Sequence, residues 1–363
     1  MKINKNSLFY IAIFLVNFFK SLGLGEGNSA YKIVMLVAIL LCGIKFLLDS
    51  LYFERRKLVI IFLLFIATIL NLFFVHKVTF ILTLIFFLAL KDISLKKAFS
   101  IIGSRILGVL LNQIFVKLDL IEIKYVNFYR DGQFILRSDL GFGHPNFIHN
   151  FFALTIFLYI VLNYKRLKPV VMVLFLTLNY LLYQYTFSRT GYYIVILFIV
   201  LIYVTKNSLI KRVFMKLAPY VQFFLLVFTF LSSTIFFNSN FVQKLDVLLT
   251  GRLHYAHLQL VDGLTPFGNS FKETSVLFDN SYSMLLSMYG VVLTMFCMII
   301  YYIYSKKIII IELQLLLFIM SIILFTESFY PSVVMNISWL VFGKIFCDGI
   351  EPIKKEFTIV NNI

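Results

Sequence analysis

The sequence predicts an all-α integral membrane protein, a polytopic bundle of about twelve transmembrane helices with two long extracytoplasmic loops. Three observations predict this class: 61% of the 363 residues are hydrophobic, only 14% are charged, and the apolar residues come in long runs. A soluble domain carries about a quarter charged residues, and a disordered chain has low hydrophobicity. Both of those classes are therefore excluded.

Twelve apolar runs delimit the predicted spans of one transmembrane domain over residues 1–363. The first run is expected to be a retained helix, because no signal-peptide cleavage site stands out after it. The fourth is short against the roughly 20 residues that cross a bilayer, so it is expected to be less tilted, extended into its flanks or re-entrant. In chain order the spans are 7–24, 31–51, 58–75, 77–91, 98–117, 147–163, 169–187, 190–205, 217–237, 281–304, 308–325 and 332–347.

The distribution of Lys and Arg orients the bundle. With the N-terminus inside, 19 of the 33 basic residues fall in inner segments and 11 in outer segments. Short cytoplasmic loops carry the excess of basic residues, so both termini are expected to be cytoplasmic. The same rule accounts for the net charge of +16 without a nucleic-acid partner. Lys45, Arg105 and Lys344 fall inside spans, toward inner ends, where their charged groups are expected to reach the interface.

Loop lengths indicate on which side of the membrane chemistry takes place. The longest inner loop, 206–216, is too short for a nucleotide-binding domain, and the chain has no Walker or GxGxxG motif. The outer loops 119–146 and 238–280 are long, and long loops tend to be functional. All five histidines lie outside or near an outer helix end, so the polar machinery is expected to be extracytoplasmic. The three cysteines form no CxxC pair, which indicates neither a disulfide framework nor a zinc site.

The first outer loop brings positive charge to the membrane surface. Arg130 and Arg137 precede the sequence Gly-His-Pro-Asn at 143–146, which enters the next span. The plain interpretation is a Gly/Pro turn in which Asn146 caps the helix. That turn does not explain two arginines and His144 on the outer face, where basic residues are disfavoured.

A second candidate is the short outer turn Ser188-Arg189-Thr190-Gly191. An arginine at a helix end can simply extend its charge to the interface. The same turn also offers a guanidinium, two hydroxyls and backbone N–H groups, which together suit an anion. Both interpretations stay open.

The second long loop contains a predicted amphipathic helix at 251–263. At about 100° per residue, one face combines Arg252, Tyr255, Gln259 and Asp262. The alternative is an interfacial helix that lies on lipid with its charges solvated. Two histidines three residues apart could bind a metal, but no third ligand is evident.

Carboxylates and a turn follow later on the outer side. Pro266-Phe-Gly268 forms a predicted turn, and Asp279 stands at the entry to the next helix, where it can be an N-cap. Glu327 lies in the last outer turn.

These motifs, in this order and topology, resemble the Wzy-type polymerases of polysaccharide repeat units (O-antigen, capsule or exopolysaccharide), relatives of the O-antigen ligases. The resemblance spans roughly residues 95–345. Arg130 to Gly141 and Arg252 to Gly263 share an Arg-x10-Gly spacing, which is similar to a pattern in some members. The other motifs that carry the resemblance are Gly143-His144-Pro145-Asn146, Ser188-Arg189-Thr190-Gly191, the Arg252 helix, Pro266-Phe-Gly268 and Asp279-Asn280-Ser281-Tyr282.

The resemblance implies a glycosyltransferase in the bacterial inner or plasma membrane. Such an enzyme transfers a growing glycan from its polyprenyl-diphosphate carrier to an incoming lipid-linked repeat unit, so that donor and acceptor are both polyprenyl-diphosphate-linked oligosaccharides. No cofactor, metal or nucleic acid is implied. Membrane lipid and other polysaccharide-export proteins, such as a chain-length regulator, are the implied partners.

A diphosphate leaving group gives roles to the outer arginines. Arginine stays charged and binds phosphate oxygens in a bidentate fork. Arg189 and Arg252 are therefore expected to clamp the diphosphate, with Arg130 or Arg137 as helpers.

The acceptor hydroxyl needs a base that works near neutral pH. Ser188 and Tyr255 are expected to bind substrate beside it. The candidate bases are His254, then His144, with Asp279 and Glu327 after them.

Other classes of protein stay open. A lipid-linked oligosaccharide flippase would have broken helices and intramembrane charges near the midplane. An O-antigen-ligase-like glycan transferase would share the outer site. A membrane O-acyltransferase would need a cytoplasmic acyl donor and histidines on that side. A surface-anchored structural protein fits the arginine-rich outer loops poorly.

Arg189 and Arg252 are expected to face the same, outer side of the membrane. Single cysteines at these two positions should react with a membrane-impermeant maleimide in sealed right-side-out vesicles. A cysteine at Lys211, in the predicted inner loop, should react only after permeabilisation. Labelling of 189 and 252 from opposite sides, or of both only from within, contradicts the prediction.

Overall fold

The computed structural model describes residues 4–25, 27–130, 132–261, 263–271 and 277–358. Within these residues the chain is helical apart from one two-stranded antiparallel sheet. The helices make it a multi-pass membrane protein, as the composition predicted. The total of twelve spans and the side on which the termini lie stay predictions.

Seven helical segments of the described residues are long and apolar enough to cross a membrane. Three further apolar helices are shorter, Thr79–Leu88, Arg189–Val204 and Ile311–Thr326. The seven long segments are Ser29–Ser50, Arg55–Val75, Leu95–Lys117, Pro145–Arg166, Pro169–Thr186, Ser208–Ser233 and Ser281–Lys307.

The helices pack into two compact units, which are described separately. Unit 1 contains residues up to Leu48, 89–208 and the chain from Glu351. In it α7 packs against α9, α8 and α5, and α1 packs against α6. The elements of unit 1 are α1 Lys5–Ser21, α2 Ser29–Ser50 (as far as Leu48), α5 Leu95–Gly103, α6 Arg105–Lys117, β1 Tyr125–Arg130, β2 Gln133–Ser138, α7 Pro145–Asn163, the 3-10 turn η1 Tyr164–Arg166, α8 Pro169–Thr186, α9 Arg189–Val204 and α18 Glu351–Thr358.

Unit 2 contains residues 49–88 and 209–350. Its centre is α16, which is buried along most of its length between α11, α14 and α17. The elements of unit 2 are α3 Arg55–Val75, α4 Thr79–Leu88, α10 Ser208–Leu217, the 3-10 turn η2 Ala218–Tyr220, α11 Val221–Ser233, α12 Asn240–Leu248, α13 Arg252–Leu260, α14 Ser281–Met284, the π-helical turn η3 Leu285–Tyr289, α15 Gly290–Lys307, α16 Ile311–Thr326 and α17 Ser338–Asp348.

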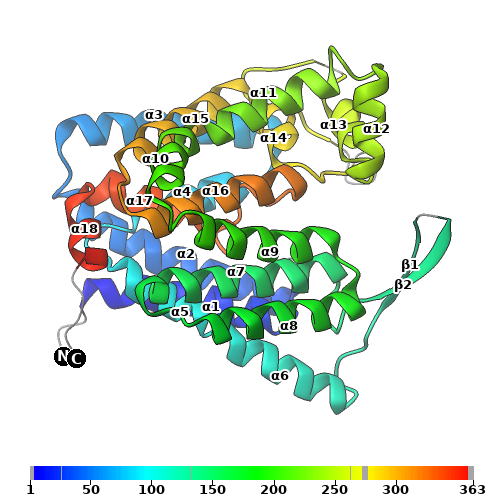
Figure 1. Cartoon of the computed structure of the whole chain (residues 1–363). Helices are drawn as coiled ribbons and strands as arrows, with labels where there is room; N and C mark the ends of the chain where they lie inside the picture. The colour runs from blue at the N-terminus through cyan, green and yellow to red at the C-terminus, as the bar shows by residue number, and fades with distance from the viewer. Residues whose placement is uncertain (1–3, 26, 131, 262, 272–276, 359–363) are drawn as a thin grey trace. The chain divides into compact units, whose positions relative to one another are not determined.

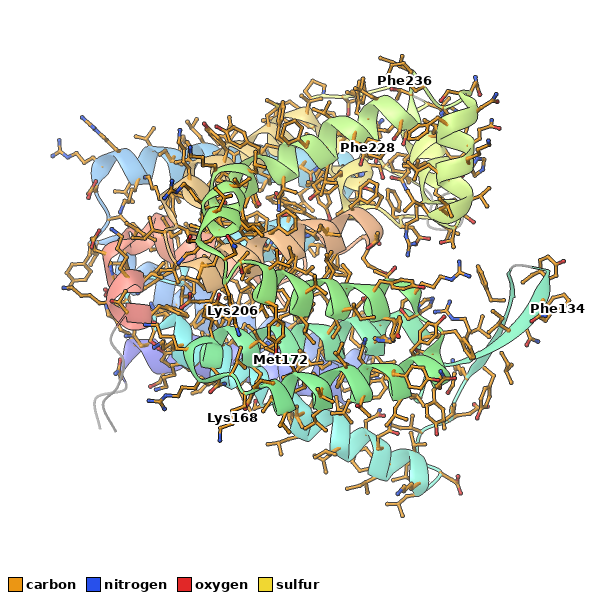
Figure 2. The ribbon with its side chains drawn as sticks, viewed as in Figure 1. Phe134, Lys168, Met172, Lys206, Phe228 and Phe236 are labelled. Carbon is orange, nitrogen blue, oxygen red and sulfur yellow. The ribbon has the colours of Figure 1, made fainter. Side chains whose placement is uncertain are left out.

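Both long predicted loops contain regular structure. In the first, β1 and β2 form a hairpin with Tyr129 opposite Phe134, and Figure 2 shows Phe134 at its tip. In the second, the short helices α12 and α13 pack against each other, and α13 packs on α11 and α14. These helices cover apolar side chains, so that the loop is a folded part of unit 2.

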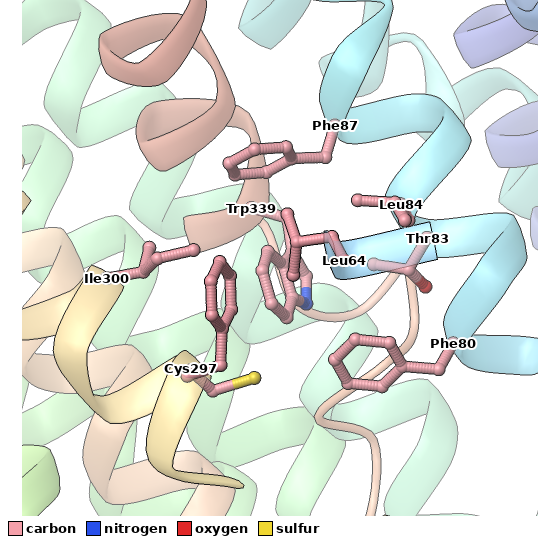
Figure 3. Close-up of a pocket in the computed structure, with 9 residues that line it drawn as sticks. Leu64, Phe80, Thr83, Leu84, Phe87, Cys297, Ile300 and Trp339 are labelled. Carbon is pink, nitrogen blue, oxygen red and sulfur yellow. The ribbon is translucent and has the colours of Figure 1, made fainter. Parts of the chain in front are cut away.

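A small apolar pocket lies among α3, α4, α15 and α17 of unit 2 (Figure 3). Leu64, Phe87, Cys297 and Trp339 are among its lining residues. The Thr83 hydroxyl at its wall donates a hydrogen bond to the carbonyl of Pro331. The lining carries no charge, so the pocket does not suit a phosphate or a carboxylate.

The predicted span 98–117 is interrupted. α5 ends at Gly103 and α6 begins at Arg105, and between them the Ser104 hydroxyl bonds back to the carbonyl of Ile101. A serine that bonds to its own helix competes with the regular helical hydrogen bonds, which favours a break or bend there.

Three cations inside the apolar helices are buried, contrary to the expectation that they extend to the interface. Lys45 donates from Nζ to the carbonyl of Lys91 at 2.7 Å, and Lys344 pairs with Asp348 at 2.5 Å. Arg105 lies at the break before α6, with its guanidinium 4.3 Å from the ring of Phe151.

The terminal nitrogens of Arg105 have no hydrogen-bond partner in the described part of unit 1. Its Nε donates to the carbonyl of Ile102 at 3.1 Å, but Nη1 and Nη2 are buried and unsatisfied. A buried cation without a hydrogen-bonded partner costs free energy, and in a membrane protein it marks a functional candidate.

Arg105→Met should leave the free energy of unfolding unchanged or raise it by about 1–4 kcal/mol, because an apolar side chain replaces an unsatisfied charge. The matched control is Lys344→Met, which removes the cation that pairs with the buried carboxylate of Asp348 and should lower stability by about 3–5 kcal/mol. Thermal unfolding of the purified protein in detergent compares the two. An equal loss in both variants would show that Arg105 has a stabilising partner.

Candidate functional site

Two helix N-termini lie together at one end of unit 1. α7 contacts α9 both where His149 meets Gly191 and where Phe157 meets Phe198, so the two helices run in the same direction. His149, in the second turn of α7, meets Gly191 in the first turn of α9, where an added Cβ would lie 2.5 Å from the imidazole ring. The positive ends of the two helix dipoles therefore point the same way at this end. The hairpin projects from the same end (Figure 1).

Arg137 of β2 ties the hairpin to these helix ends. Its side chain is buried, Nε donates to the carbonyl of Thr186 at 2.8 Å, and Nη2 donates to Oδ1 of Asn146 at 2.5 Å. The ring of Phe128, on the neighbouring strand, lies 5.9 Å from the guanidinium. Arg137 thus places a permanent positive charge beside the first turn of α7. It has a bridging role that its position in the sequence did not reveal.

The N-cap of α7 differs from the expectation. His144, not Asn146, occupies that position, and its Nδ1 accepts the backbone N–H of Asn146 at 3.1 Å. An imidazole that accepts at Nδ1 carries its proton on Nε2 when it is neutral. His144 can therefore donate a hydrogen bond from Nε2, which suits a phosphate oxygen better than it suits a general base.

His149 is fully buried and is held at both ring nitrogens. Nδ1 lies 2.9 Å from the hydroxyl of Thr186, and Nε2 lies 2.9 Å from Oδ1 of Asn179. Asn179 in turn donates to the carbonyl of Tyr192 on α9 at 3.0 Å. This polar bridge fixes α7, α8 and α9 to one another. Neither His149 nor Asn179 was among the predicted site residues, although two polar residues within apolar spans are a usable signal.

Ser188 and Arg189 form the start of α9. Ser188 is the N-cap, but its hydroxyl makes no capping bond, and it is buried without a hydrogen-bond partner among the described residues. The first N–H groups of a helix have no intrahelical acceptor. The buried Ser188 hydroxyl and the half-buried Arg189 therefore stand at a helix N-terminus, which is the kind of position that suits an anion.

Carboxylates are scarce around this end of unit 1. The chain has no Asp or Glu from residue 140 to residue 245. Asp139, directly before that segment, already accepts the backbone N–H groups of Lys124, Gly141 and Gly143 at 2.9–3.0 Å. Lys20 of α1 adds a further cation, 5.1 Å from the ring of Phe147. The side chain of Arg130 lies outside the described residues.

Unit 2 holds Arg252 at the first position of α13. The N-cap is Gly251, which has no side chain, so the carboxylate of Asp246 on α12 accepts the N–H groups of Leu253 at 2.7 Å and His254 at 3.2 Å. Nη2 of Arg252 forms an ion pair with Oε1 of Glu327 at 3.7 Å. Both side chains are mostly buried, with 12% and 16% exposed. The arginine is therefore positioned before any substrate arrives.

Glu327 is anchored beside the entry to α14. Its carbonyl accepts the hydroxyl of Ser281 at 2.5 Å. The N-cap of α14 is Asn280, whose Oδ1 accepts from Tyr282 at 2.8 Å, so Asp279 does not cap this helix. The structure thereby brings the Asp279–Tyr282 motif and Glu327 together.

The predicted amphipathic helix is present as α13, but it is not an interfacial helix. Its apolar face is buried within unit 2, and Gln259 of the predicted polar face is buried as well, donating to the carbonyl of Leu277 at 2.7 Å. Tyr255 is half-buried and His254 is exposed. His257 stacks on Phe237 with ring centroids 3.9 Å apart. Asp262 lies outside the described residues.

Tyr330, three residues after Glu327, is poorly suited to act as a base. Burial raises the pKa of Tyr330, between α16 and α17, well above its ordinary value. Its hydroxyl donates to Gln222 at 3.3 Å. In the described part of the chain, no three His, Cys, Asp or Glu side chains are grouped as a metal would require.

Arg189 belongs to unit 1 and Arg252 to unit 2, so their joint action as a clamp stays a prediction, as does the choice of base. Comparison with known protein families, with curated proteins and with solved structures finds no match to this chain. The functional argument therefore depends on the residues themselves.

Gly191→Ala should lower the free energy of unfolding by about 1–3 kcal/mol, because the new methyl group would overlap a ring that two hydrogen bonds hold in place. Gly43→Ala in α2 is the matched control, since an added Cβ there meets nothing within 4 Å. It should be neutral or slightly stabilising. Thermal unfolding in detergent measures both, and equal midpoints would contradict the close packing of α7 on α9.

Proposed function

We propose that this protein is a membrane glycosyltransferase that joins polyprenyl-diphosphate-linked oligosaccharide repeat units into a long polysaccharide on the extracytoplasmic face. The observation that carries the proposal is the end of unit 1 where two helix N-termini meet Arg137, Arg189 and the unsatisfied hydroxyl of Ser188. Such a group of donors suits a phosphate ester. A lipid-linked diphosphate is one phosphate ester that an apolar helical protein meets at its surface, and phospholipid headgroups are another.

The proposed reaction is a substitution at the anomeric carbon of the donor glycan. A hydroxyl oxygen of the acceptor repeat unit bonds to that carbon while the bond from the carbon to the diphosphate oxygen breaks. The proton of the hydroxyl goes to a base of the protein. The lipid diphosphate leaves as an anion, so cationic side chains stabilise the charge that develops on it.

Arg252 and Glu327 support the second half of this chemistry. Among the four candidate bases, Glu327 is the carboxylate paired with a proposed diphosphate-binding arginine. In the proposed reaction its position beside Arg252 would put a carboxylate next to the diphosphate, where the acceptor hydroxyl must lose its proton. His254 stays a candidate base because it is exposed on the same short helix as Arg252.

A flippase for the same lipid-linked oligosaccharide is the second candidate. One observation favours it, namely the break between α5 and α6 with the buried, unsatisfied Arg105 beside it. Broken helices and intramembrane charges are typical of transporters. Loss of a flippase leaves lipid-linked units on the inner leaflet, whereas loss of a polymerase leaves single units on the outer side.

Arg189→Ala and Arg252→Ala should each reduce polymerisation by about 10²–10³-fold, since each removes a charge that stabilises the transition state. The measurement is the chain-length profile of the surface glycan in cells that carry equal amounts of each variant. Arg166→Ala, an exposed arginine at the opposite end of α7, is the control and should give normal chains. Full-length polymer at normal levels in both test variants would refute the proposal, and units trapped on the inner leaflet would favour the flippase.

A further inference from the structure

Helix α10 is amphipathic, and the proposed glycosyl transfer gives it no role. Its sequence is SLIKRVFMKL, from Ser208 to Leu217. At about 100° per residue, five of the six apolar side chains fall within one arc of roughly 140°, and Met215 lies on the opposite side. The basic side chains occupy the opposite arc, with Lys216 and Arg212 on one border of the apolar arc and Lys211 toward the other. Lys206, labelled in Figure 2, precedes the helix and adds a further positive charge.

All ten residues of α10 are described, and none of them is buried. Three side chains of its apolar arc are exposed, with exposed fractions of 66% for Leu209, 48% for Val213 and 60% for Leu217. A helix with this much exposed apolar surface is not stable facing water, so it requires an apolar environment.

The helix is nevertheless held at one end. Phe214 contacts Phe318 of α16, with ring centroids 5.1 Å apart. The η2 turn that follows contains the buried residues Ala218 and Pro219, and the carbonyl of Ala218 accepts the hydroxyl of Tyr301 at 3.0 Å. Pro219 interrupts the helical hydrogen bonds between α10 and α11, so α10 can leave the direction of the span. A fixed end and an outward apolar arc together suit a helix that lies flat on a membrane.

We propose that α10 lies in the membrane interface and binds the headgroups of anionic phospholipids through Lys211, Arg212 and Lys216. The positive charge of α10 calls for an anionic partner, because no Asp or Glu occurs between residues 140 and 245 to neutralise these cations. Lysine and arginine at the border of an apolar arc can extend to headgroup phosphates while their stems stay in the acyl region. A second copy of the chain would place like charges against each other. This inference does not depend on the proposed glycosyl transfer.

The test uses the full-length protein reconstituted in vesicles of phosphatidylglycerol and phosphatidylcholine. The two lipids are mixed at a molar ratio of ~1:4, which gives the vesicles an anionic surface. Electron paramagnetic resonance with spin-labelled phosphatidylglycerol or phosphatidylcholine measures which lipid is immobilised by the protein. The pair Arg212→Gln and Lys216→Gln should lower the preference for phosphatidylglycerol by at least about fivefold, since each basic residue near such a surface contributes about that factor.

The matched control is Arg55→Gln with Arg56→Gln, an exposed basic pair at the start of α3. It removes the same charge from another predicted inner segment, so its effect measures net charge alone, and the loss of preference in the α10 pair should exceed it. An unchanged preference in the α10 pair, or an equal loss in both pairs, overturns the proposal.

A second measurement places the helix directly. The three native cysteines are buried, so a nitroxide can be attached through Val213→Cys alone. Collisions of the label with oxygen should exceed those with a water-soluble nickel chelate, as they do in the acyl region. The reverse order would show a helix in water, and dipolar broadening between labels would show a second copy; either result overturns the proposal.

Discussion

The close approach of α7 and α9 is the contact on which the end of unit 1 that carries Arg189 depends. It is possible because Gly191 has no Cβ and because His149 is held at both nitrogens. A polar group buried in an apolar bundle costs free energy unless it is hydrogen-bonded. The imidazole of His149 and the side chains of Thr186 and Asn179 therefore stabilise one another. With the two helices this close, their N-terminal N–H groups and dipoles act on one region. Arg189 stands at that place because it is the first residue of α9.

Hydropathy predicted the apolar helices well, because an apolar segment of suitable length has few other stable states in a bilayer. It did not predict the break at Ser104, since an average over a whole span does not register one local hydrogen bond. Nor did it predict that Arg105 is buried. The distribution of Lys and Arg predicts that the charge of Arg105 lies near a helix end. Whether that side chain is exposed depends on neighbouring helices such as α7, which carries Phe151.

The hairpin was predictable and was missed. Residues 125–130 and 133–138 are rich in aromatic and branched side chains, and Asp131-Gly132 between them is a strong two-residue turn signal. The candidate site was predictable only in its composition. The sequence pointed to Ser188, Arg189 and Arg252. It could not show that Asp246 caps the helix of Arg252, because that hydrogen bond depends on how α12 packs against α13.

The two arginine sites differ in how their charge is compensated, and this difference bears on what each can do. Arg252 is paired with Glu327 at 3.7 Å, so an anion that binds to it must compete with a carboxylate that is already in place. Arg137 donates to the carbonyl of Thr186 and to the amide oxygen of Asn146, both of which are uncharged acceptors. A cation near helix N-termini attracts a diphosphate. A cation held beside a carboxylate is better suited to a step in which a hydroxyl loses its proton next to a developing negative charge. Within the proposed reaction, unit 1 therefore has the features of a diphosphate-binding site, and unit 2 has those of a site that activates a hydroxyl.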